Sequence, residues 1–293
     1  MRLLVTIPHY ARPETADSEK PRYRSLAADL SQRVQALTAC LTALHSLYNG
    51  DHWFIDHAQR EAQRAEPILP CTLDVVICTT QGCHLLDLLP VDPCHFSHLP
   101  TDAEPLFLGF ACQAVLHERL GRYDWYGYLE DDLIMRDPWH FIKLAWFNRL
   151  AGDDMVLQAN RFEAGLNLAT AKVYVDGTLA RRVTAPFQNV DDSAPIVVAE
   201  VMGAPVRFER TLNPHSGCFF LNARQMAHWA AQPHFLDHDS RFIGPLETTA
   251  TLGIMRTFKV YRPAPPNADF LEVQHFGTSY LEKLRGNQER TNR

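Results

Sequence analysis

The chain has 293 residues, a hydrophobic fraction of 46% and a formal net charge of −6. This length and apolar content suffice for one large α/β domain, and the mild acidic excess excludes DNA or RNA binding through a broad basic face. An odd count of seven cysteines argues against a disulfide framework. No run nears the ~18 apolar residues of a membrane span, and the first residues lack signal-peptide features, so we expect a cytoplasmic protein with no transmembrane segment.

The first half of the chain alternates buried strands with helices. A leucine or valine recurs every three or four residues between Leu26 and Leu47, which predicts a long amphipathic helix directly after an N-terminal strand. Asp137-Pro138 is typical of a helix start. The expected strands are residues 3–8, 73–78, 96–99 and 124–132, and the expected helices are residues 26–47, 51–66, 105–120 and 137–150.

The second half contains more antiparallel material. Asp176-Gly177 between two short apolar runs predicts a hairpin. Further strands are expected at 155–159, 196–201, 206–210, 217–221, 259–262 and 271–276, and helices at 223–231 and 247–258. The pattern predicts an α/β fold with a mixed central sheet flanked by helices and a smaller antiparallel portion in the C-terminal half. We expect one domain over residues 1–284, followed by a polar tail over 285–293.

Three carboxylates follow the aromatic strand DWYGYL. Side chains alternate along a strand, so Glu130 and Asp132 share one face and Asp131 points the other way. Adjacent carboxylates at the end of a buried strand repel one another, and a hard divalent cation would neutralise them. Ligands of open α/β sheets also collect beyond the carboxyl ends of the strands. The alternative is an acidic, solvated loop that caps the next helix.

The phrase GYLEDDLIM resembles the acidic motif of GT-A glycosyltransferases, which is often Asp-X-Asp or Glu-Asp-Asp. The resemblance implies a GT-A-like, Rossmann-related fold with a nucleotide-binding half over residues 1–135 and an acceptor-binding half over 136–284. It implies that Asp132 ligates Mn²⁺ or Mg²⁺, and that Glu130 or Asp131 faces the ribose or the water shell of the metal. It does not identify a particular family.

Two further strand ends resemble the nucleotide-binding parts of these enzymes. In IPHYARP, backbone groups near Pro8 and His9 would contact the base, and Arg12 would reach the diphosphate. The strand end at Thr79 resembles a second base contact, but an acidic residue common in relatives is missing there. The alternative for Pro8–Arg12 is a strand followed by a solvated loop.

Three residues of the second half complete the resemblance. Gly217 lies in a small-residue turn, which in these enzymes passes under the donor sugar and the acceptor. Glu247, at the start of a helix, corresponds to the catalytic base of inverting members, with Asp237 and Asp239 as competitors. His275 corresponds to a C-terminal metal ligand. The alternatives are an ordinary turn, an acid that favours a helix dipole, and a structural histidine.

Together these features predict a metal-dependent glycosyltransferase that moves a sugar from a nucleotide-sugar donor, with a UDP-sugar favoured, to a hydroxyl of a carbohydrate or lipid-linked acceptor, with inversion. A metal-dependent hydrolase that uses the same carboxylates is an alternative, as is a catalytically silent carbohydrate-binding relative. A nucleotidyltransferase is disfavoured because no Gly-rich basic loop follows the first strand. A zinc site is disfavoured because the cysteines show no compact Cys-X-X-Cys spacing.

Overall fold

The computed structural model describes residues 1–13, 26–27, 30–50, 52–166, 170–188 and 196–284, so the expected polar tail over 285–293 lies outside the described residues. The chain forms two compact units. Unit 1 comprises Met1–Asp131 and Phe220–Ala231, and unit 2 comprises Asp132–Phe219 and Gln232–Arg293. None of the helices in the described ranges combines the length and apolar character needed to cross a membrane.

The elements follow one another in an order that largely agrees with the sequence pattern. The strands are β1 Arg2–Pro8, β2 Arg12–Pro13, β3 Leu26–Ala27, β4 His52–Asp56, β5 Glu61–Ala65, β6 Thr72–Thr80, β7 Ser97–Thr101, β8 Trp125–Leu129, β9 Leu133–Ile134, β10 Met155–Leu157, β11 Asn160–Ala164, β12 Lys172–Tyr174, β13 Ile196–Val201, β14 Ala204–Arg210, β15 Cys218–Asn222, β16 Lys259–Pro263 and β17 Glu272–His275. The main helices are α1 Ser31–Tyr48, α2 Leu108–Glu118, α3 His140–Ala151, α4 Arg181–Thr184, α5 Ala223–Ala230 and α6 Pro245–Thr257.

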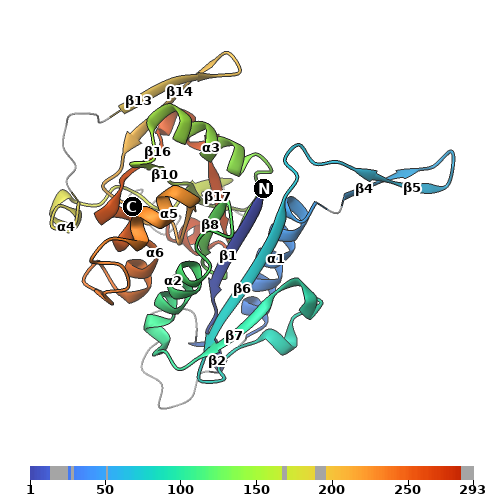
Figure 1. The fold of residues 1–293 in the computed structure, drawn as a ribbon, viewed down its shortest axis with the longest axis horizontal. Helices are drawn as coiled ribbons and strands as arrows, with labels where there is room; N and C mark the ends of the chain where they lie inside the picture. The colour runs from blue at the N-terminus through green and yellow to red at the C-terminus, as the bar shows by residue number, and fades with distance from the viewer. Residues whose placement is uncertain (14–25, 28–29, 51, 167–169, 189–195, 285–293) are drawn as a thin grey trace, which may run out of the picture. The chain divides into compact units, whose positions relative to one another are not determined.

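The core of unit 1 is a five-stranded sheet in the order β15-β8-β1-β6-β7 (Figure 1). The strands β8, β1, β6 and β7 run parallel, which places their carboxyl ends at one edge. The central strand β1 is apolar, and Leu3, Leu4, Val5 and Ile7 are fully buried because both faces of the sheet are covered. Helix α2 packs on β1, β6 and β8, and α1 packs on β6. The predicted mixed α/β class is confirmed by this sheet.

The order of the strands reverses at β1. The chain leaves β1 for β6 and β7 on one side and then returns to β8 on the other. In open α/β sheets, such a switch point opens a crevice beyond the carboxyl ends of the two strands, and ligands bind there. The residues that follow β1 and β8 are His9 and the run Glu130-Asp131. The topology of unit 1 therefore brings these residues to one edge.

Glycine is required at one position of β8. A Cβ atom on Gly127 would lie 2.6 Å from Cε1 of Phe220, closer than real Cβ contacts. The buried strand WYGYL therefore has a gap between two tyrosines that admits the ring from β15. This close packing fixes β8 immediately before the acidic run.

The segment 51–66 was predicted as a helix, and that prediction is wrong. The described part forms a hairpin of β4 and β5, a two-stranded sheet of its own that extends away from the five-stranded sheet of unit 1 (Figure 1). Trp53, Phe54 and Ile55 are 56%, 67% and 73% exposed. Aromatic and β-branched residues favour strands, and this local preference prevails over the helix-favouring Ala, Gln and Glu of the second strand.

Unit 2 is built on two four-stranded sheets. One has the order β10-β16-β14-β13 and the other the order β12-β11-β17-β9. In the second sheet, β17 runs parallel to β11 and antiparallel to β9, with Phe162 opposite Gln274 and His275 opposite Leu133. This register places Glu163, which follows Phe162, and Asp132, which precedes Leu133, on either side of His275. The antiparallel portion expected in the C-terminal half is thus confirmed, including the β13–β14 hairpin.

The hairpin predicted around Asp176-Gly177 is wrong. Lys172–Tyr174 forms β12, which pairs with β11, and residues 181–184 form the short helix α4. The carboxylate of Asp176 is instead held inside unit 2 by two arginines. Long-range ion pairing therefore overrides a local turn preference.

Candidate functional site

The acidic run begins where β8 ends. All five residues of β8 are buried, and the chain passes from unit 1 to unit 2 between Asp131 and Asp132. The strand was predicted to reach Asp132, but it ends at Leu129 and Asp131 and Asp132 lie in a turn, so the predicted alternation of side chains does not extend to them. Asp131 is placed within unit 1 and Asp132 within unit 2, so the two carboxylates have different partners.

Asp131 lies in a closed cluster in unit 1. Its Oδ2 atom is 2.6 Å from Nδ1 of His9 and also accepts a hydrogen bond from Arg33 of α1. His9 is fully buried, and its Nε2 accepts a hydrogen bond from the backbone N–H of Leu85, at 3.2 Å. Nδ1 must therefore carry the proton and donate it to Asp131. The resemblance placed Asp131 near the ribose or the metal's water shell, whereas the structure gives its carboxylate these internal partners.

The strand ends predicted to contact the base also have internal partners. The backbone N–H of His9 donates to the carbonyl of Cys78, and Pro8 has no N–H, so neither offers a backbone donor to a base. The hydroxyl of Thr79 lies 2.7 Å from Nε2 of His98. Arg12 is exposed at the start of β2. Base contacts by Pro8, His9 and Thr79, and diphosphate contact by Arg12, stay predictions.

Asp132 and His275 meet in unit 2. Nε2 of His275 lies 3.5 Å from Oδ2 of Asp132, although the two residues are far apart in the sequence. The antiparallel pairing of β9 with β17 explains the approach, because the backbone N–H of Phe276 donates to the carbonyl of Asp132. Both were predicted as metal ligands, and the structure brings them together. Glu130 is half-buried in unit 1.

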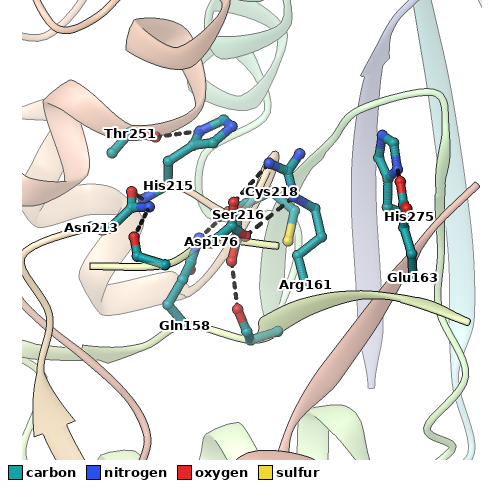
Figure 2. Close-up of polar contacts among 12 residues, drawn as sticks. Gln158, Arg161, Glu163, Asp176, Asn213, His215, Ser216, Cys218, Thr251 and His275 are labelled. Atoms are coloured by element: carbon teal, nitrogen blue, oxygen red, sulfur yellow. Dashed lines mark hydrogen bonds and ion pairs between the residues drawn. The ribbon is translucent and has the colours of Figure 1, made fainter. Parts of the chain in front are cut away.

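A buried carboxylate lies behind His275. Oε1 of Glu163 is 2.9 Å from Nδ1 of His275 (Figure 2), whereas Asp132 lies near the other ring nitrogen, Nε2. Glu163 is fully buried and follows Phe162 in β11, where the parallel register places it beside His275. No motif in the sequence pointed to Glu163. Burial lowers the pKa of His275, but its bonds to Asp132 and Glu163 outweigh burial, so the pKa is raised above its ordinary value.

A second buried cluster lies next to this group. Arg161 precedes Glu163 by two residues in β11, so the two side chains leave the same face of the strand. Its guanidinium donates two hydrogen bonds to Asp176 (Figure 2), and Arg262 of β16 lies 3.7 Å from the same carboxylate. Burial alone would raise the pKa of Asp176, but the charges of Arg161 and Arg262 hold it below its ordinary value.

The turn that precedes β15 is fixed by this second cluster. Gly217 has φ of +66°, a conformation that suits glycine. Arg262 donates to the carbonyl of His215 and to the hydroxyl of Ser216, and that hydroxyl donates to the carbonyl of Ala159. These hydrogen bonds anchor the turn. Its geometry is compatible with the predicted role of Gly217 beside a sugar.

His215 connects this turn to helix α6. Nδ1 of His215 lies 3.1 Å from the hydroxyl of Thr251 (Figure 2). Burial, aided by Arg161, lowers the pKa of His215 to about 3, so its ring is neutral at physiological pH. Glu247 lies one turn before Thr251 on the same face of α6. Through His215, the turn at Gly217 thus contacts the face of α6 that carries Glu247, the candidate base.

The competing acids lie at the other end of α6. Asp237 and Asp239 both contact Arg256, at 2.9 and 3.4 Å, and Asp239 also pairs with Arg241. Hydrogen bonds from Arg241 lower the pKa of Asp239 to about 2. With a rise of ~1.5 Å per residue, Glu247 and Arg256 are about 13 Å apart along the helix axis. Glu247 and the two competing acids therefore lie toward opposite ends of α6.

The donor set at Asp132 and His275 fits a divalent cation. Ligands that share one small cation lie roughly 3 Å apart, close to the 3.5 Å observed between these atoms. Within the described ranges, no group of three or more His, Cys, Asp or Glu side chains is arranged to hold a metal. Mg²⁺ in nucleotide enzymes is commonly held by one or two protein ligands together with substrate phosphates and water. The pair suits that mode of binding.

Comparisons with known proteins give distant structural similarities. No protein-family model matches the sequence, and a search of curated proteins finds no match. The chain is similar to a structure of CMP:2-keto-3-deoxy-manno-octonic acid synthetase in complex with CTP, with 12% identity, a TM-score of 0.33, and coverage of 99% of this chain and 100% of that chain. It is also similar to mouse xyloside xylosyltransferase 1 in its apo form, with 11% identity, a TM-score of 0.38, and coverage of 89% and 85%. Similarity at this level does not assign an activity.

Proposed function

We propose that this protein is a metal-dependent glycosyltransferase that moves a sugar from a nucleotide-sugar donor to an acceptor hydroxyl. One observation carries the proposal. Asp132 and His275, from distant parts of the sequence, face each other in unit 2 with Glu163 bonded to the far side of the imidazole. A carboxylate behind a ligating histidine is a recurrent feature of protein metal sites.

Asp132 and His275 would hold Mn²⁺ or Mg²⁺ by a carboxylate oxygen and by Nε2. A cation held there would supply positive charge to stabilise the diphosphate leaving group. The donor's phosphate oxygens would complete the ligand set, since the chain itself supplies few ligands. A UDP-sugar is the donor we favour, and a cytoplasmic location suits such a donor.

The remaining side chains act on the sugar and the acceptor. The Gly217 turn, held by Arg262, would allow a sugar to approach the backbone closely. Glu247 would accept the proton of the acceptor hydroxyl, which makes the reaction an inverting one. Neutral His215 adds no positive charge to compete with the cation. An acceptor of carbohydrate or lipid-linked type fits this chemistry.

Calorimetric binding of nucleotides tests the proposal. We expect UDP or a related nucleoside diphosphate to bind at least ~10-fold more tightly with Mn²⁺ or Mg²⁺ than with EDTA, because Asp132 and His275 would hold the cation, which would offset the charge of the phosphates. Asp132→Ala should remove this metal dependence and leave the protein folded. Equal affinity with and without metal, across UDP, GDP and CMP, would refute the assignment.

Substitution of the base tests the inverting mechanism. Glu247→Gln keeps the size of the side chain but cannot accept a proton, so the transfer rate should fall by ~10²–10⁴-fold with donor affinity unchanged. Glu209→Gln is a matched control, because Glu209 is an exposed acid paired with Arg207. A fully active Glu247→Gln enzyme would favour a retaining mechanism and return attention to Asp237 and Asp239.

A further inference from the structure

Glu163 is a fully buried carboxylate with an unusual set of partners. Oε1 lies 2.9 Å from Nδ1 of His275 and 3.2 Å from the hydroxyl of Ser279, and Oε2 accepts the backbone N–H groups of Tyr280 and Leu281 at 2.7 and 3.1 Å (Figure 2 shows the contact with His275). The two backbone groups can only donate. The carboxylate of Glu163 is therefore compensated by donors on both oxygen atoms.

Burying the Glu163 carboxylate costs free energy, and a neutral side chain could not replace it here. A buried ionised carboxylate loses its hydration, and only good hydrogen bonds offset that loss. A glutamine has one accepting oxygen and an amide that must donate. It could not accept from His275 and from both backbone N–H groups at once.

The contact with Glu163 determines how His275 faces Asp132. Because Nδ1 donates its proton to Glu163, the neutral ring presents the lone pair of Nε2 toward Asp132. A lone pair and a carboxylate oxygen repel each other unless a cation lies near both. The neutral ring is thus set to share a cation with Asp132, and a protonated ring places its own proton on Nε2 at the same position.

The same carboxylate holds the start of the C-terminal helix. Residues 279–284 are helical, and Tyr280 and Leu281 lie in the first turn, where backbone N–H groups have no partner within the helix. Glu163 accepts two of these donors and its charge complements the positive end of the helix dipole. One side chain therefore orients a metal ligand and fixes the segment that follows it.

We propose that Glu163 is the positioning residue of the cation site, and that it couples cation binding at Asp132 and His275 to the order of residues 278–284. This inference rests on the proposed function for the identity of the bound ligand. The cation favours the His275 orientation that Glu163 enforces, and that orientation keeps the carboxylate in place for Tyr280 and Leu281. By linkage, loss of Glu163 weakens cation binding, and loss of the cation loosens the helix start.

A double-mutant cycle with full-length protein tests this role. Mn²⁺ affinity in the presence of UDP is measured by calorimetry for wild type, Glu163→Gln, His275→Ala and the double variant. We expect Glu163→Gln to weaken Mn²⁺ binding by ~10–100-fold in the wild-type background and to have no further effect in His275→Ala. Glu272→Gln, a β17 acid paired with Lys172 and Tyr174, is the matched control and should stay near wild type.

Two outcomes of the cycle would overturn the proposal. Either Glu163→Gln binds Mn²⁺ as wild type does, or it loses as much affinity with His275 absent as with His275 present, which would mark a purely structural role. Hydrogen exchange supplies a second readout. Added Mn²⁺ and UDP should slow exchange at Tyr280 and Leu281 in wild type but not in His275→Ala. Equal protection in both proteins would contradict the coupling between cation binding and the order of this segment.

A measurement without metal separates this inference from the proposed function. In alkaline buffer, ¹⁵N NMR of the metal-free wild-type protein should show His275, assigned with His275→Ala, protonated on Nδ1. Protonation on Nε2 would refute the positioning role, even where nucleotide binding proves metal-dependent. If His275 is protonated on Nδ1 but the protein binds no nucleotide, the positioning role of Glu163 would be supported and the glycosyltransferase assignment refuted. The test needs no Glu163 variant, so it holds if that variant fails to fold.

Discussion

Asp131 and Asp132 are neighbours in the sequence, and each faces a histidine, but the two pairs are built differently. In unit 1, Asp131 lies 2.6 Å from His9, and Arg33 contacts the same oxygen. In unit 2, Asp132 lies 3.5 Å from His275. The Asp131 side chain is 9% exposed and the Asp132 side chain 24% exposed. The first carboxylate is neutralised by the protein, whereas the second is accessible to an external cation.

The difference originates at the far nitrogen of each imidazole. Nε2 of His9 accepts from Leu85, so the nitrogen that faces Asp131 carries the proton and the pair closes. Nδ1 of His275 donates to Glu163, so in the neutral ring the nitrogen that faces Asp132 carries a lone pair. The same two residue types thus form a closed structural contact in unit 1 and the proposed ligand pair in unit 2, depending on the third group.

Removal of each aspartate should give the sharpest contrast between the pairs. Asp131→Ala leaves His9 and Arg33 without their acceptor, and we expect a loss of roughly 3 kcal/mol in the free energy of unfolding. Asp132→Ala should change that free energy by less than about 1 kcal/mol, because the side chain is partly exposed. Chemical denaturation midpoints measure both. Equal losses, or a larger loss at Asp132, would abolish the distinction.

Removal of each histidine should give a smaller, separable effect. His275→Ala is expected to weaken metal-supported nucleotide binding by ~10–100-fold with a modest change in stability. His9→Ala should lower stability, because it removes a hydrogen-bond partner from Asp131 and from the N–H of Leu85. It should leave the Mn²⁺ dependence of nucleotide binding unchanged. Unchanged binding in His275→Ala would make His275 a structural residue like His9.

Mild acid should lower stability through two buried histidines of unit 2, His215 and His140. Burial lowers the pKa of His215 to about 3 and that of His140 to about 4, so below pH ~6.5 the unfolded chain binds protons that these folded residues do not. Stability is therefore lost as the pH falls through this window, by up to about 1.4 kcal/mol per pH unit for each residue. His275, with a raised pKa, opposes this trend.

Hydrogen exchange at pH 5 and pH 7 would locate the acid effect. Amides of unit 2 should lose protection first, and His215→Gln should flatten the dependence, since it removes the group that must be protonated on unfolding. The charged groups that act on His215 are Arg161, Asp176, Arg262 and Asp132, and they are retained in this variant. A pH dependence unchanged by His215→Gln would assign the loss to other groups.

Much of the fold was predictable because its strands are continuous apolar runs and its helices are periodic. β1, β6, α1 and α2 follow this rule, although α1 begins at Ser31 rather than at Leu26. The hairpin β4–β5 was missed because its residues carry no clear period. The turn at Asp176-Gly177 was misjudged because the partners of Asp176, Arg161 and Arg262, are brought near only by the tertiary fold.

The candidate site was predictable only in part. Asp132 and His275 were found through resemblance to a motif, and the structure brings them together. Glu163 and Arg161 were not found, because their importance depends on the register between β11 and β17. One signal was present in the sequence: an acid and a base at alternate positions in NRFEA, which forms a buried strand where charges need partners.

The β4–β5 hairpin has a consequence for work with the purified protein. It exposes Trp53, Phe54 and Ile55 on a narrow two-stranded ribbon, which is the kind of surface that adds strands from other molecules. The charges at its tip, among them Asp56, Arg60 and Glu61, oppose that addition and are screened by salt. Shelf life should therefore fall with rising protein concentration and ionic strength, and dilute, low-salt storage is the condition that the hairpin favours.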